Sequence, residues 1–286
     1  MNGKRPATGS QSMAKAFAVL SAFTLARPRR RGSDIARELG LSESTVSRVL
    51  AGLEAVGFVE RDPESGLHHL GLWPVQLATI SMLSREIVHA AMPRLATLTQ
   101  ELGVTSNLGV MHEDQVYSLA TFSTPKLASL FALPGIPIPV HSTAMGAVLA
   151  AYLPHDQREQ MLRRLTYRRY TANTVTSAEA FRAKLQGVRA RGFAVDREES
   201  GPGCVCIAVP VFGADGTVIA ACGISALSTQ RVISARGRQT ITRVIEQAGE
   251  ISRSLRYVPA QSAGLADAGP SDEFERLHLE MTEAMA

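Results

Sequence analysis

Cysteine is scarce in this chain of 286 residues, which has only three, Cys204, Cys206 and Cys222. Three cysteines cannot form a disulfide framework, and without a CxxC pair or neighbouring histidines they do not match the spacing of a zinc site. We therefore expect reduced thiols and neither a metal ion nor a cofactor.

Long apolar runs and aromatic residues are also missing. No apolar run reaches the ~18 residues of a membrane-spanning helix, and the N-terminus lacks the apolar core of a signal peptide. Aromatic residues make up 5% of the chain, too few for a platform that stacks single-stranded nucleic acid. These absences predict a cytoplasmic protein with no membrane partner.

The motifs of common enzyme classes are absent as well, because GxSxG, GxGxxG, HExxH and the phosphate-binding GxxxxGK pattern do not occur. We therefore do not expect an enzyme. Two alternatives stay open: a cysteine-dependent enzyme in which His141 activates Cys206, and a redox sensor that uses Cys204 and Cys206. On a strand these two thiols share one face, although Cα atoms ~6.5–7 Å apart rarely close an unstrained disulfide.

Positive charge is concentrated near the N-terminus, although the net charge of the whole chain is only +4. Residues 1–70 contain 10 basic and 7 acidic side chains, a balance of +3. Four arginines, Arg27, Arg29, Arg30 and Arg31, lie within five positions. Such a local positive field suits a polyanionic partner.

The length predicts two domains, because a single domain commonly has about 100–200 residues. Helical periodicity dominates up to Gly103, and short strands with groups of helices follow, which favours the α+β class. A stripe of Trp73, Ile80 and Ile87 marks a connecting helix that packs on its own domain or on a second subunit. We assign a flexible N-terminus to 1–12, a first domain to 13–73, the connecting helix to 74–92, a second domain to 93–258 and a flexible tail to 259–286.

The segment between Ser33 and Leu70 has the pattern of a winged helix-turn-helix. Ser33 and Ser42 are good N-caps for two successive helices, and Gly40 is placed to end the first of them in a left-handed conformation. Apolar residues recur along the second helix at the helical spacing, and two short strands around a Pro- and Gly-containing turn follow as a hairpin. This order of elements predicts binding to double-stranded DNA.

Polar side chains of the second helix fall on its outer face near the N-terminal half. Arg48 can bond guanine with two hydrogen bonds, and hydroxyl groups can contact bases or backbone. The upstream arginines are expected to contact phosphates, which position a protein without reading the sequence. The predicted DNA-binding residues are Ser42, Ser44, Thr45, Ser47, Arg48, Arg29, Arg30 and Arg31.

About 240 residues resemble, in order, a known family, the IclR-type transcriptional regulators. The resemblance lies in LSESTVSRVLAGLEAVGFVE, in PVHSTAMGAVLAAYLP (139–154), in RGFAVDREES (191–200) and in GCVCIAVPVFGADGTVIAACGIS (203–225). It implies a winged helix-turn-helix joined by a helix to a GAF-like antiparallel-sheet effector domain, in a dimer or a dimer of dimers. Two positions depart from the family's usual pattern: Ala147 replaces a common lysine, and Ser42 with Glu43 replaces proline and a basic residue.

The expected effector is a small organic acid. A helix that starts at Ala144, Met145 and Gly146 offers free N–H groups and small side chains to a carboxylate. The resemblance implies that this segment converges on the effector pocket with Asp196, Cys206 and Ser225. Apolar walls are expected from Leu108, Val110 and Leu130. The two thiols of Cys204 and Cys206 also have a simple structural explanation, as small buried hydrophobic groups.

Overall fold

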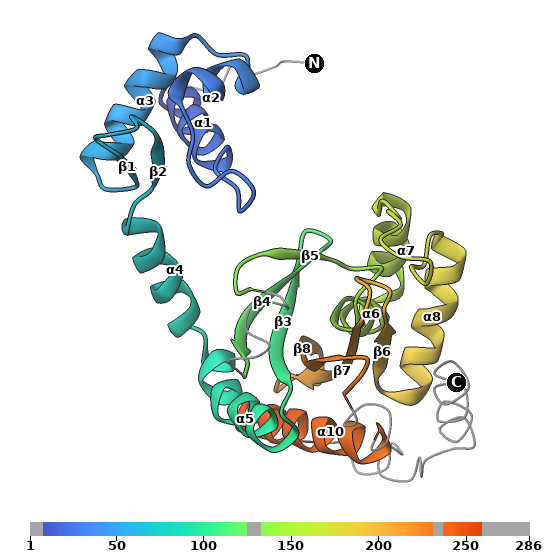
Figure 1. Ribbon diagram of the computed structural model, residues 1–286. Helices are drawn as coiled ribbons and strands as arrows, with labels where there is room; N and C mark the ends of the chain where they lie inside the picture. Colours follow the sequence, from blue (N-terminus) through green and yellow to red (C-terminus); the bar gives the residue numbers. More distant parts are fainter. Residues whose placement is uncertain (1–7, 125–132, 231–236, 259–286) are drawn as a thin grey trace. The chain divides into compact units, whose positions relative to one another are not determined.

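The structure, a computed structural model, describes residues 8–124, 133–230 and 237–258 (Figure 1). The described residues form two compact units that divide after Ser84. The predicted tail over 259–286 lies wholly outside the described residues. Within the described ranges no helix is long and apolar enough to cross a membrane.

The first unit is a three-helix bundle with a two-stranded hairpin and a following helix. Its core is formed by buried side chains of α1, α2, α3 and β1, with Val19, Ile35 and Val46 fully enclosed. Gly40 ends α2 with φ of +63°, the conformation that glycine adopts at little cost. The elements are α1 (Thr8–Ser21), α2 (Gly32–Leu39), α3 (Glu43–Ala55), β1 (Val59–Arg61), β2 (His68–Leu70) and α4 (Trp73–Leu83).

Helix α1 begins at Thr8, so the prediction that the first twelve residues are frayed is wrong for residues 8–12. The apolar periodicity starts only at Met13, but a helix that has already nucleated gains one hydrogen bond for each added residue without a new nucleation cost. Polar residues can therefore extend it.

The predicted single connecting helix over 74–92 is instead two helices. The chain leaves the helical conformation at Arg85, whose φ and ψ are −94° and 116°, and α5 (Glu86–Leu102) follows. Pro93 lies inside α5, so the predicted boundary between residues 92 and 93 falls in the middle of a helix. The helix continues through it because Val88, Ala91 and Leu95 are buried on one face, which compensates for the missing hydrogen bond.

The second unit is a six-stranded sheet in the order β5-β4-β3-β8-β7-β6, and all paired neighbours are antiparallel. The α+β class and the antiparallel-sheet architecture are thus confirmed. The strands are β3 (Thr105–His112), β4 (Gln115–Phe122), β5 (Pro137–Pro139), β6 (Ala194–Arg197), β7 (Cys204–Phe212) and β8 (Val218–Leu227).

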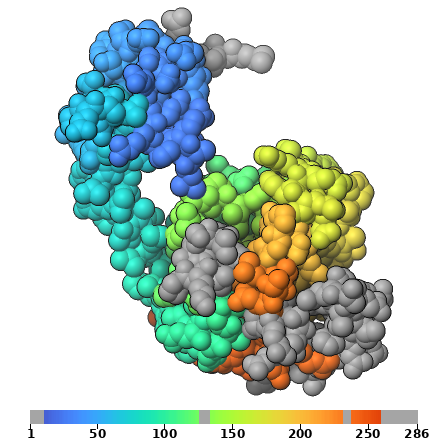
Figure 2. Space-filling model, viewed as in Figure 1, coloured from blue at the N-terminus to red at the C-terminus, as the bar shows by residue number. Residues whose placement is uncertain are grey.

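Helices cover both faces of this sheet (Figure 1). On one face α5 and α10 pack on alternate strand residues such as Ile207, Cys222 and Ile224. On the other face α6 packs on small residues such as Ala208 and Ala221, with α7 and α8 outside it. The helices are α6 (Ala144–Ala151), α7 (His155–Arg164), α8 (Ala178–Arg191) and α10 (Gly237–Ser254). In the space-filling view the yellow-green and yellow residues of α7 and α8 lie on the outer surface of this unit (Figure 2).

Candidate DNA-binding face and effector site

The N-terminus of α3 is capped by Ser42, as the sequence predicts. Its Oγ accepts a hydrogen bond from the Thr45 amide at 3.3 Å, and it also contacts the Thr45 and Ser44 hydroxyls at 2.8 and 3.2 Å. The three hydroxyls therefore form one cluster at the first turn. Glu43 lies in the same turn, where its charge is favourable to the helix dipole.

The outer face of α3 carries the predicted base-reading side chains. Ser44, Ser47 and Arg48 are exposed, whereas Val46 and Leu50 on the opposite face are buried. Among the ion pairs of the described residues none involves Arg48, so its guanidinium remains available to an external partner.

Arg30 is not an exposed member of the arginine cluster, which corrects the sequence prediction. Its side chain is only 7% exposed, and it donates to the Ala22 carbonyl at 2.8 Å and to Glu38 at 2.7 Å. The guanidinium thereby links the end of α1 to α2. Because its donors are used inside the unit, Arg30 is not part of the DNA-binding surface that we propose below.

Arg29 and Arg31 remain exposed beside the hairpin. Arg29 forms an ion pair at 3.2 Å with Asp62, the first residue of the hairpin turn. Hydrogen bonds from the amide and hydroxyl of Ser65 lower the pKa of Asp62 to about 2, so this carboxylate is charged at neutral pH. Arg31 is the N-cap residue of α2 and has no ion-pair partner among the described residues.

The hairpin is held against the helices at two points. The backbone of Arg30 exchanges two hydrogen bonds with the backbone of His68, at 2.9 and 2.8 Å. The His68 side chain contacts Glu54 of α3 at 3.0 Å. The hairpin is thus fixed relative to α3, as a wing that contacts DNA beside a recognition helix must be.

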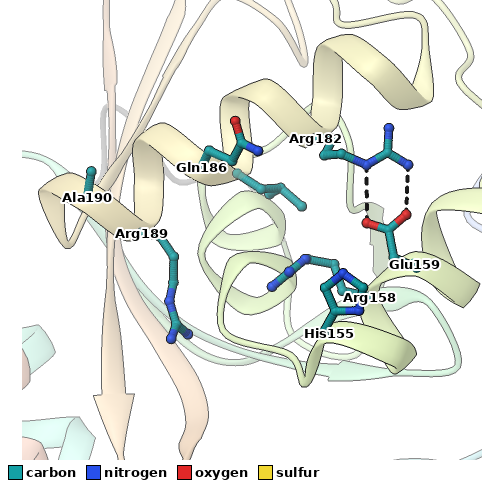
Figure 3. A pocket seen from close by; sticks show the side chains of 8 residues that line it. His155, Arg158, Glu159, Arg182, Gln186, Arg189 and Ala190 are labelled. Carbon is teal, nitrogen blue, oxygen red and sulfur yellow. Dashed lines mark hydrogen bonds and ion pairs between the residues drawn. The ribbon is translucent and has the colours of Figure 1, made fainter.

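In the second unit, a pocket of about 510 Å³ lies between α7 and α8 (Figure 3). None of the six predicted effector residues lines it. They lie instead on the sheet face that α6 covers and at the start of α6.

Asp196, Cys206 and Ser225 occupy matching register positions on three neighbouring strands. Asp196 of β6 is the register partner of Cys206 of β7, which is the register partner of Ser225 of β8. Residues opposite one another in an antiparallel pair point to the same face, so the three side chains form one row. The structure therefore brings together the residues that the family resemblance implied.

The Cys206 thiol belongs to this row as a neutral group. It donates to the Ser225 hydroxyl at 3.2 Å, and its sulfur lies 3.5 Å from that of Cys204. The contact with Cys204 and the burial of the sulfur raise the pKa of Cys206 well above its usual value. A protonated thiol is a weak nucleophile, which argues against covalent catalysis at this position.

His141 does not activate Cys206. The His141 Nε2 bonds to the Arg168 carbonyl at 2.9 Å, and the ring packs against Tyr167 with centroids 5.5 Å apart. Burial lowers the pKa of His141, so the ring is neutral at pH 7. No hydrogen bond joins His141 to Cys206, both of which the structure describes.

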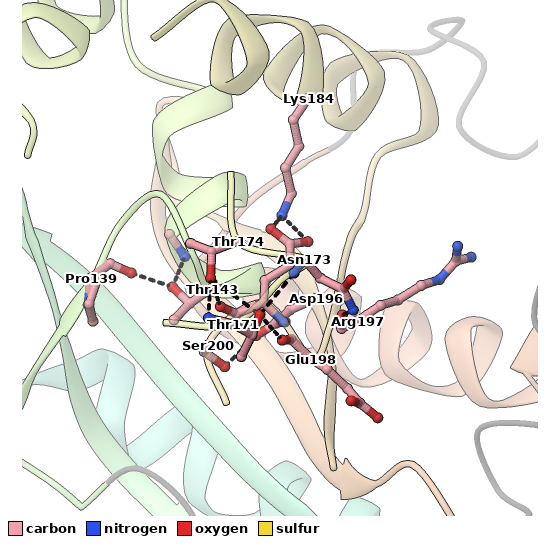
Figure 4. Close-up of polar contacts among 12 residues, drawn as sticks. Pro139, Thr143, Thr171, Asn173, Thr174, Lys184, Asp196, Arg197, Glu198 and Ser200 are labelled. Carbon is pink, nitrogen blue, oxygen red and sulfur yellow. Dashed lines mark hydrogen bonds and ion pairs between the residues drawn. The ribbon is translucent and has the colours of Figure 1, made fainter. Parts of the chain in front are cut away.

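Asp196 is fully buried and organises the turn that follows β6 (Figure 4). One carboxylate oxygen accepts from the Glu199 amide and the other from the Ser200 hydroxyl, each at 2.7 Å. Burial raises the pKa of Asp196 to about 6. The same turn is held by Thr174, whose hydroxyl donates to the Glu199 carbonyl, and by Lys184, which pairs with the Glu199 carboxylate at 2.6 Å.

The first turn of α6 lies directly on the sheet. A Cβ on Gly109 would come within 2.8 Å of the Met145 sulfur, and one on Gly146 would come within 2.2 Å of the Val140 carbonyl oxygen. Thr143 caps the helix by accepting from the Gly146 amide at 3.2 Å. The capping leaves the amides of Ala144 and Met145 as the remaining donors of this turn.

The Ser142 hydroxyl immediately precedes this turn and is fully buried without a hydrogen-bond partner among the described residues. Ser142 is not among the effector residues predicted from the sequence. A buried polar atom without a partner is uncommon, because its desolvation is not compensated. Ser142 is therefore an additional candidate for contact with a ligand.

Leu108 and Val110 do not form walls of the effector site as predicted, because successive side chains of β3 point to opposite faces of the sheet. Leu108 and Val110 pack toward α5 and α10, on the opposite face of the sheet. The adjacent Asn107 points to the α6 face, where it contacts Ser225 at 3.4 Å and accepts from Thr121 at 3.0 Å. The alternation of Thr105, Asn107 and Gly109 in the sequence was the available signal for this face. Leu130 lies outside the described residues.

Comparison with known proteins agrees with the two units. Residues 12–63 match the IclR helix-turn-helix domain, and residues 80–253 match the bacterial transcriptional regulator IclR C-terminal family. The chain belongs to the IclR family. It is a transcriptional regulator with a helix-turn-helix DNA-binding domain and an effector-binding C-terminal domain, and not an enzyme.

Several IclR-family proteins are similar along most of their length. The HTH-type transcriptional regulator XynR of Escherichia coli is 32% identical over 248 residues, covering 86% of this chain and 98% of XynR. The HTH-type transcriptional regulator BhcR of Paracoccus denitrificans is 34% identical, covering 87% of this chain and 85% of BhcR. A solved IclR homologue from Microbacterium hydrocarbonoxydans, complexed with 4-hydroxybenzoate, has a TM-score of 0.75 at 28% identity and covers 86% of this chain and 99% of that one.

Proposed function

We propose that this IclR-family regulator acts in the cytoplasm, where α3 binds an operator in double-stranded DNA and a small organic acid bound in the second unit modulates that binding. The observation that carries the effector assignment is the row of Asp196, Cys206 and Ser225 beside the first turn of α6. An operator-binding assay with purified protein, with and without candidate acids, tests the proposal. A change of operator affinity by an acid supports it.

For DNA, we propose that α3 lies in the major groove and the hairpin lies along the backbone. The exposed Arg48, Ser44 and Ser47 are then placed to reach base edges, while Arg31 and Arg29 contact phosphates. Ser42 and Thr45 hold the first turn of α3 through their hydroxyl cluster and contact the backbone from there.

For the effector, the chemistry of the site favours a single carboxylate. The donors that remain there are the amides of Ala144 and Met145 and the hydroxyls of Ser142 and Ser225, all of which suit an anion. No positive side chain is added, because Ala147 replaces the lysine that is common in the family. The 4-hydroxybenzoate in the Microbacterium homologue is an aromatic acid, which supports this ligand class.

Asp196 has a positioning role in this proposal. Both of its carboxylate oxygens are already occupied, so it holds the 198–200 turn beside the site rather than a ligand hydroxyl. The neutral Cys206 thiol beside it adds no negative charge to the site.

We expect Ser225→Ala to weaken the effector response roughly tenfold, because a hydrogen bond from a neutral hydroxyl to a charged carboxylate contributes about 1.5 kcal/mol. Operator binding without the effector should be unchanged. The measurement is the acid concentration that halves or doubles operator occupancy in a gel shift. Ser254→Ala, at the exposed end of α10, is the matched control. Equal effector sensitivity of Ser225→Ala and wild type would exclude Ser225 from the site.

We also propose that the protein is a homodimer in which α4 of one chain packs on a second copy. None of the α4 residues is buried, although Leu77, Ile80 and Leu83 are apolar and the helix carries no charge. An exposed apolar helix of this kind is typical of a subunit interface. Two copies would also present two recognition helices to a two-fold symmetric operator.

Ile80→Glu is expected to convert the dimer to a monomer, because the change buries a charge in the apolar contact. Light scattering after size-exclusion chromatography gives the mass directly. Ser81→Glu adds the same charge beside the stripe and should leave the dimer intact. A wild-type monomer, or an Ile80→Glu dimer of unchanged affinity, would refute the α4 interface.

A further inference from the structure

The pocket between α7 and α8 is basic. Three arginines and a histidine line it together with a single carboxylate, and Leu185 and Ala190 supply apolar atoms. The side chains that line it are His155, Arg158, Glu159, Arg182, Leu185, Gln186, Arg189 and Ala190.

Two of the three guanidinium groups lack a carboxylate partner among the described residues. Arg182 is paired with Glu159 through two hydrogen bonds of 3.1 and 2.7 Å (Figure 3). Arg158 contacts only the backbone carbonyls of Ala151 and Leu153, at 3.4 Å, and Arg189 lies over the Tyr152 ring at 4.9 Å. Neither Arg158 nor Arg189 therefore forms an ion pair among the described residues, although Arg158 is close enough to Glu159 to contribute to the lowered pKa of that carboxyl.

The segment that forms this pocket is strongly basic. Residues 155–191 contain nine basic and three acidic side chains, a balance of +6, whereas the entire chain has a balance of +4. Three of these basic side chains are paired with carboxylates, Arg164 with Asp114, Arg182 with Glu159 and Lys184 with Glu199, and the others leave an excess of positive charge on this segment. An excess of basic side chains on one surface favours an anionic partner.

The chain itself contains a segment of opposite charge. Residues 259–286 have six acidic side chains and one basic side chain, a balance of −5. The acidic residues begin at Asp267 and are densest around Asp272, Glu273 and Glu275. These residues lie outside the described part of the structure, so only their sequence enters the argument.

The described chain ends next to the basic pocket. The Tyr257 ring stacks on Phe212 at 4.9 Å, and Phe212 packs edge-on against Tyr152 at 5.9 Å. Tyr152 is the ring under Arg189. Eight residues separate Val258 from Asp267, and at ~3.3 Å per residue they reach farther than these ring separations combined.

We propose that the acidic segment from Asp267 to Glu283 docks on the basic α7–α8 pocket of the same chain, with its carboxylates facing Arg158 and Arg189. The segment carries the complementary charge, and the described chain that leads to it ends beside the pocket, within reach of the intervening residues. The contact is electrostatic, and it is expected to weaken as salt is added. The pocket is then an internal docking site, separate from the effector site under α6.

Hydrogen–deuterium exchange of the full chain, read by mass spectrometry, tests this docking. Amides of the acidic segment should exchange several-fold more slowly in the protein than in a free peptide of residues 259–286. The protection should be lost in ~1 M salt, where the Debye length is ~3 Å. It should also be lost in the double variant Arg158→Glu/Arg189→Glu, but not in Arg85→Glu, which reverses a charge at the start of α5.

A charge swap separates docking from a folding defect. Adding Glu273→Arg/Glu275→Arg to Arg158→Glu/Arg189→Glu should restore protection, which a misfolded α7–α8 pair would not allow. An unprotected segment in the wild type, or protection that persists in Arg158→Glu/Arg189→Glu, overturns the proposal. So does protection that disappears on dilution, which would place the segment on a second copy. If pyrophosphate alone protects α7 and α8 while the segment stays unprotected, the pocket binds a free anion instead.

Discussion

Arg48→Ala is expected to weaken specific operator binding by about 1–3 kcal/mol per half-site, a loss of roughly 10- to 100-fold. The reason is geometric. Arg48 is exposed on the outer face of α3, it has no ion-pair partner among the described residues, and the buried Val46 and Leu50 fix the helix from behind. A guanidinium in that position can bond a guanine edge with two hydrogen bonds, and alanine leaves that edge unpaired.

The measurement is a titration of operator DNA and of unrelated DNA at several salt concentrations. Arg48→Ala should lose affinity mainly for the operator. Arg31→Ala should instead weaken both DNAs to a similar extent and reduce the slope of log affinity against log salt by about one unit, as expected for a phosphate contact. Operator affinity of Arg48→Ala equal to wild type would show that α3 is not the reading helix.

Arg30→Ala is expected to lower the free energy of unfolding of the first unit by about 1–3 kcal/mol, because the buried Ala22 carbonyl loses its donor. The side chain is 7% exposed and links α1 to α2, so its loss also leaves a cavity between them. Arg29→Ala, one residue earlier, removes only a surface ion pair with Asp62 and should change stability by less than about 0.5 kcal/mol.

Urea denaturation followed by tryptophan fluorescence distinguishes these two arginines. Trp73 is the single tryptophan of the chain, and it packs on Phe58 with ring centroids 6.5 Å apart, so it reports on the first unit. The midpoint should fall for Arg30→Ala and stay for Arg29→Ala. Equal midpoints for the two variants would show that Arg30 does not hold α1 and α2 together.

Arg30 also shows what a sequence can and cannot predict here. The caps at Ser42 and Gly40 and the apolar spacing of α3 are local signals, and the helix-turn-helix follows from them. Four arginines within five positions carry no periodicity, so nothing in the sequence separates the buried one from the exposed ones. Only the approach of the Ala22 carbonyl and Glu38, both distant in sequence, decides which guanidinium is enclosed.

The effector site likewise has features that the sequence predicts and features that it does not. The residues of the row across β6, β7 and β8 were inferred from the family resemblance, and the strand register brings them together. The sequence prediction chose the wrong face of β3, because Leu108 and Val110 are apolar, whereas Asn107 and Gly109 alternate with them and face α6. A strand of alternating residues has two faces, and the sequence does not say which face meets α6 until the neighbouring strands are paired.

The break between α4 and α5 likewise depends on contacts that lie far apart in sequence. Pro93 is the strongest local signal for a boundary, yet α5 runs through it because Ala91, Leu95 and Leu98 are buried against the sheet. The actual boundary at Arg85 has no proline or glycine to mark it. Tertiary packing therefore outweighs the local preference at both positions.

The central claim is that the first unit selects particular DNA sequences so that the second unit can report on a metabolite. The most direct test is to incubate the purified protein with genomic fragments, to sequence the fragments that it retains, and to repeat the selection with pooled small organic acids. We predict strong enrichment of a few fragments that share a two-fold related sequence, and a change in their retention when an effective acid is present. Retention of random competitor as efficient as that of any genomic fragment, under both conditions, would contradict the claim.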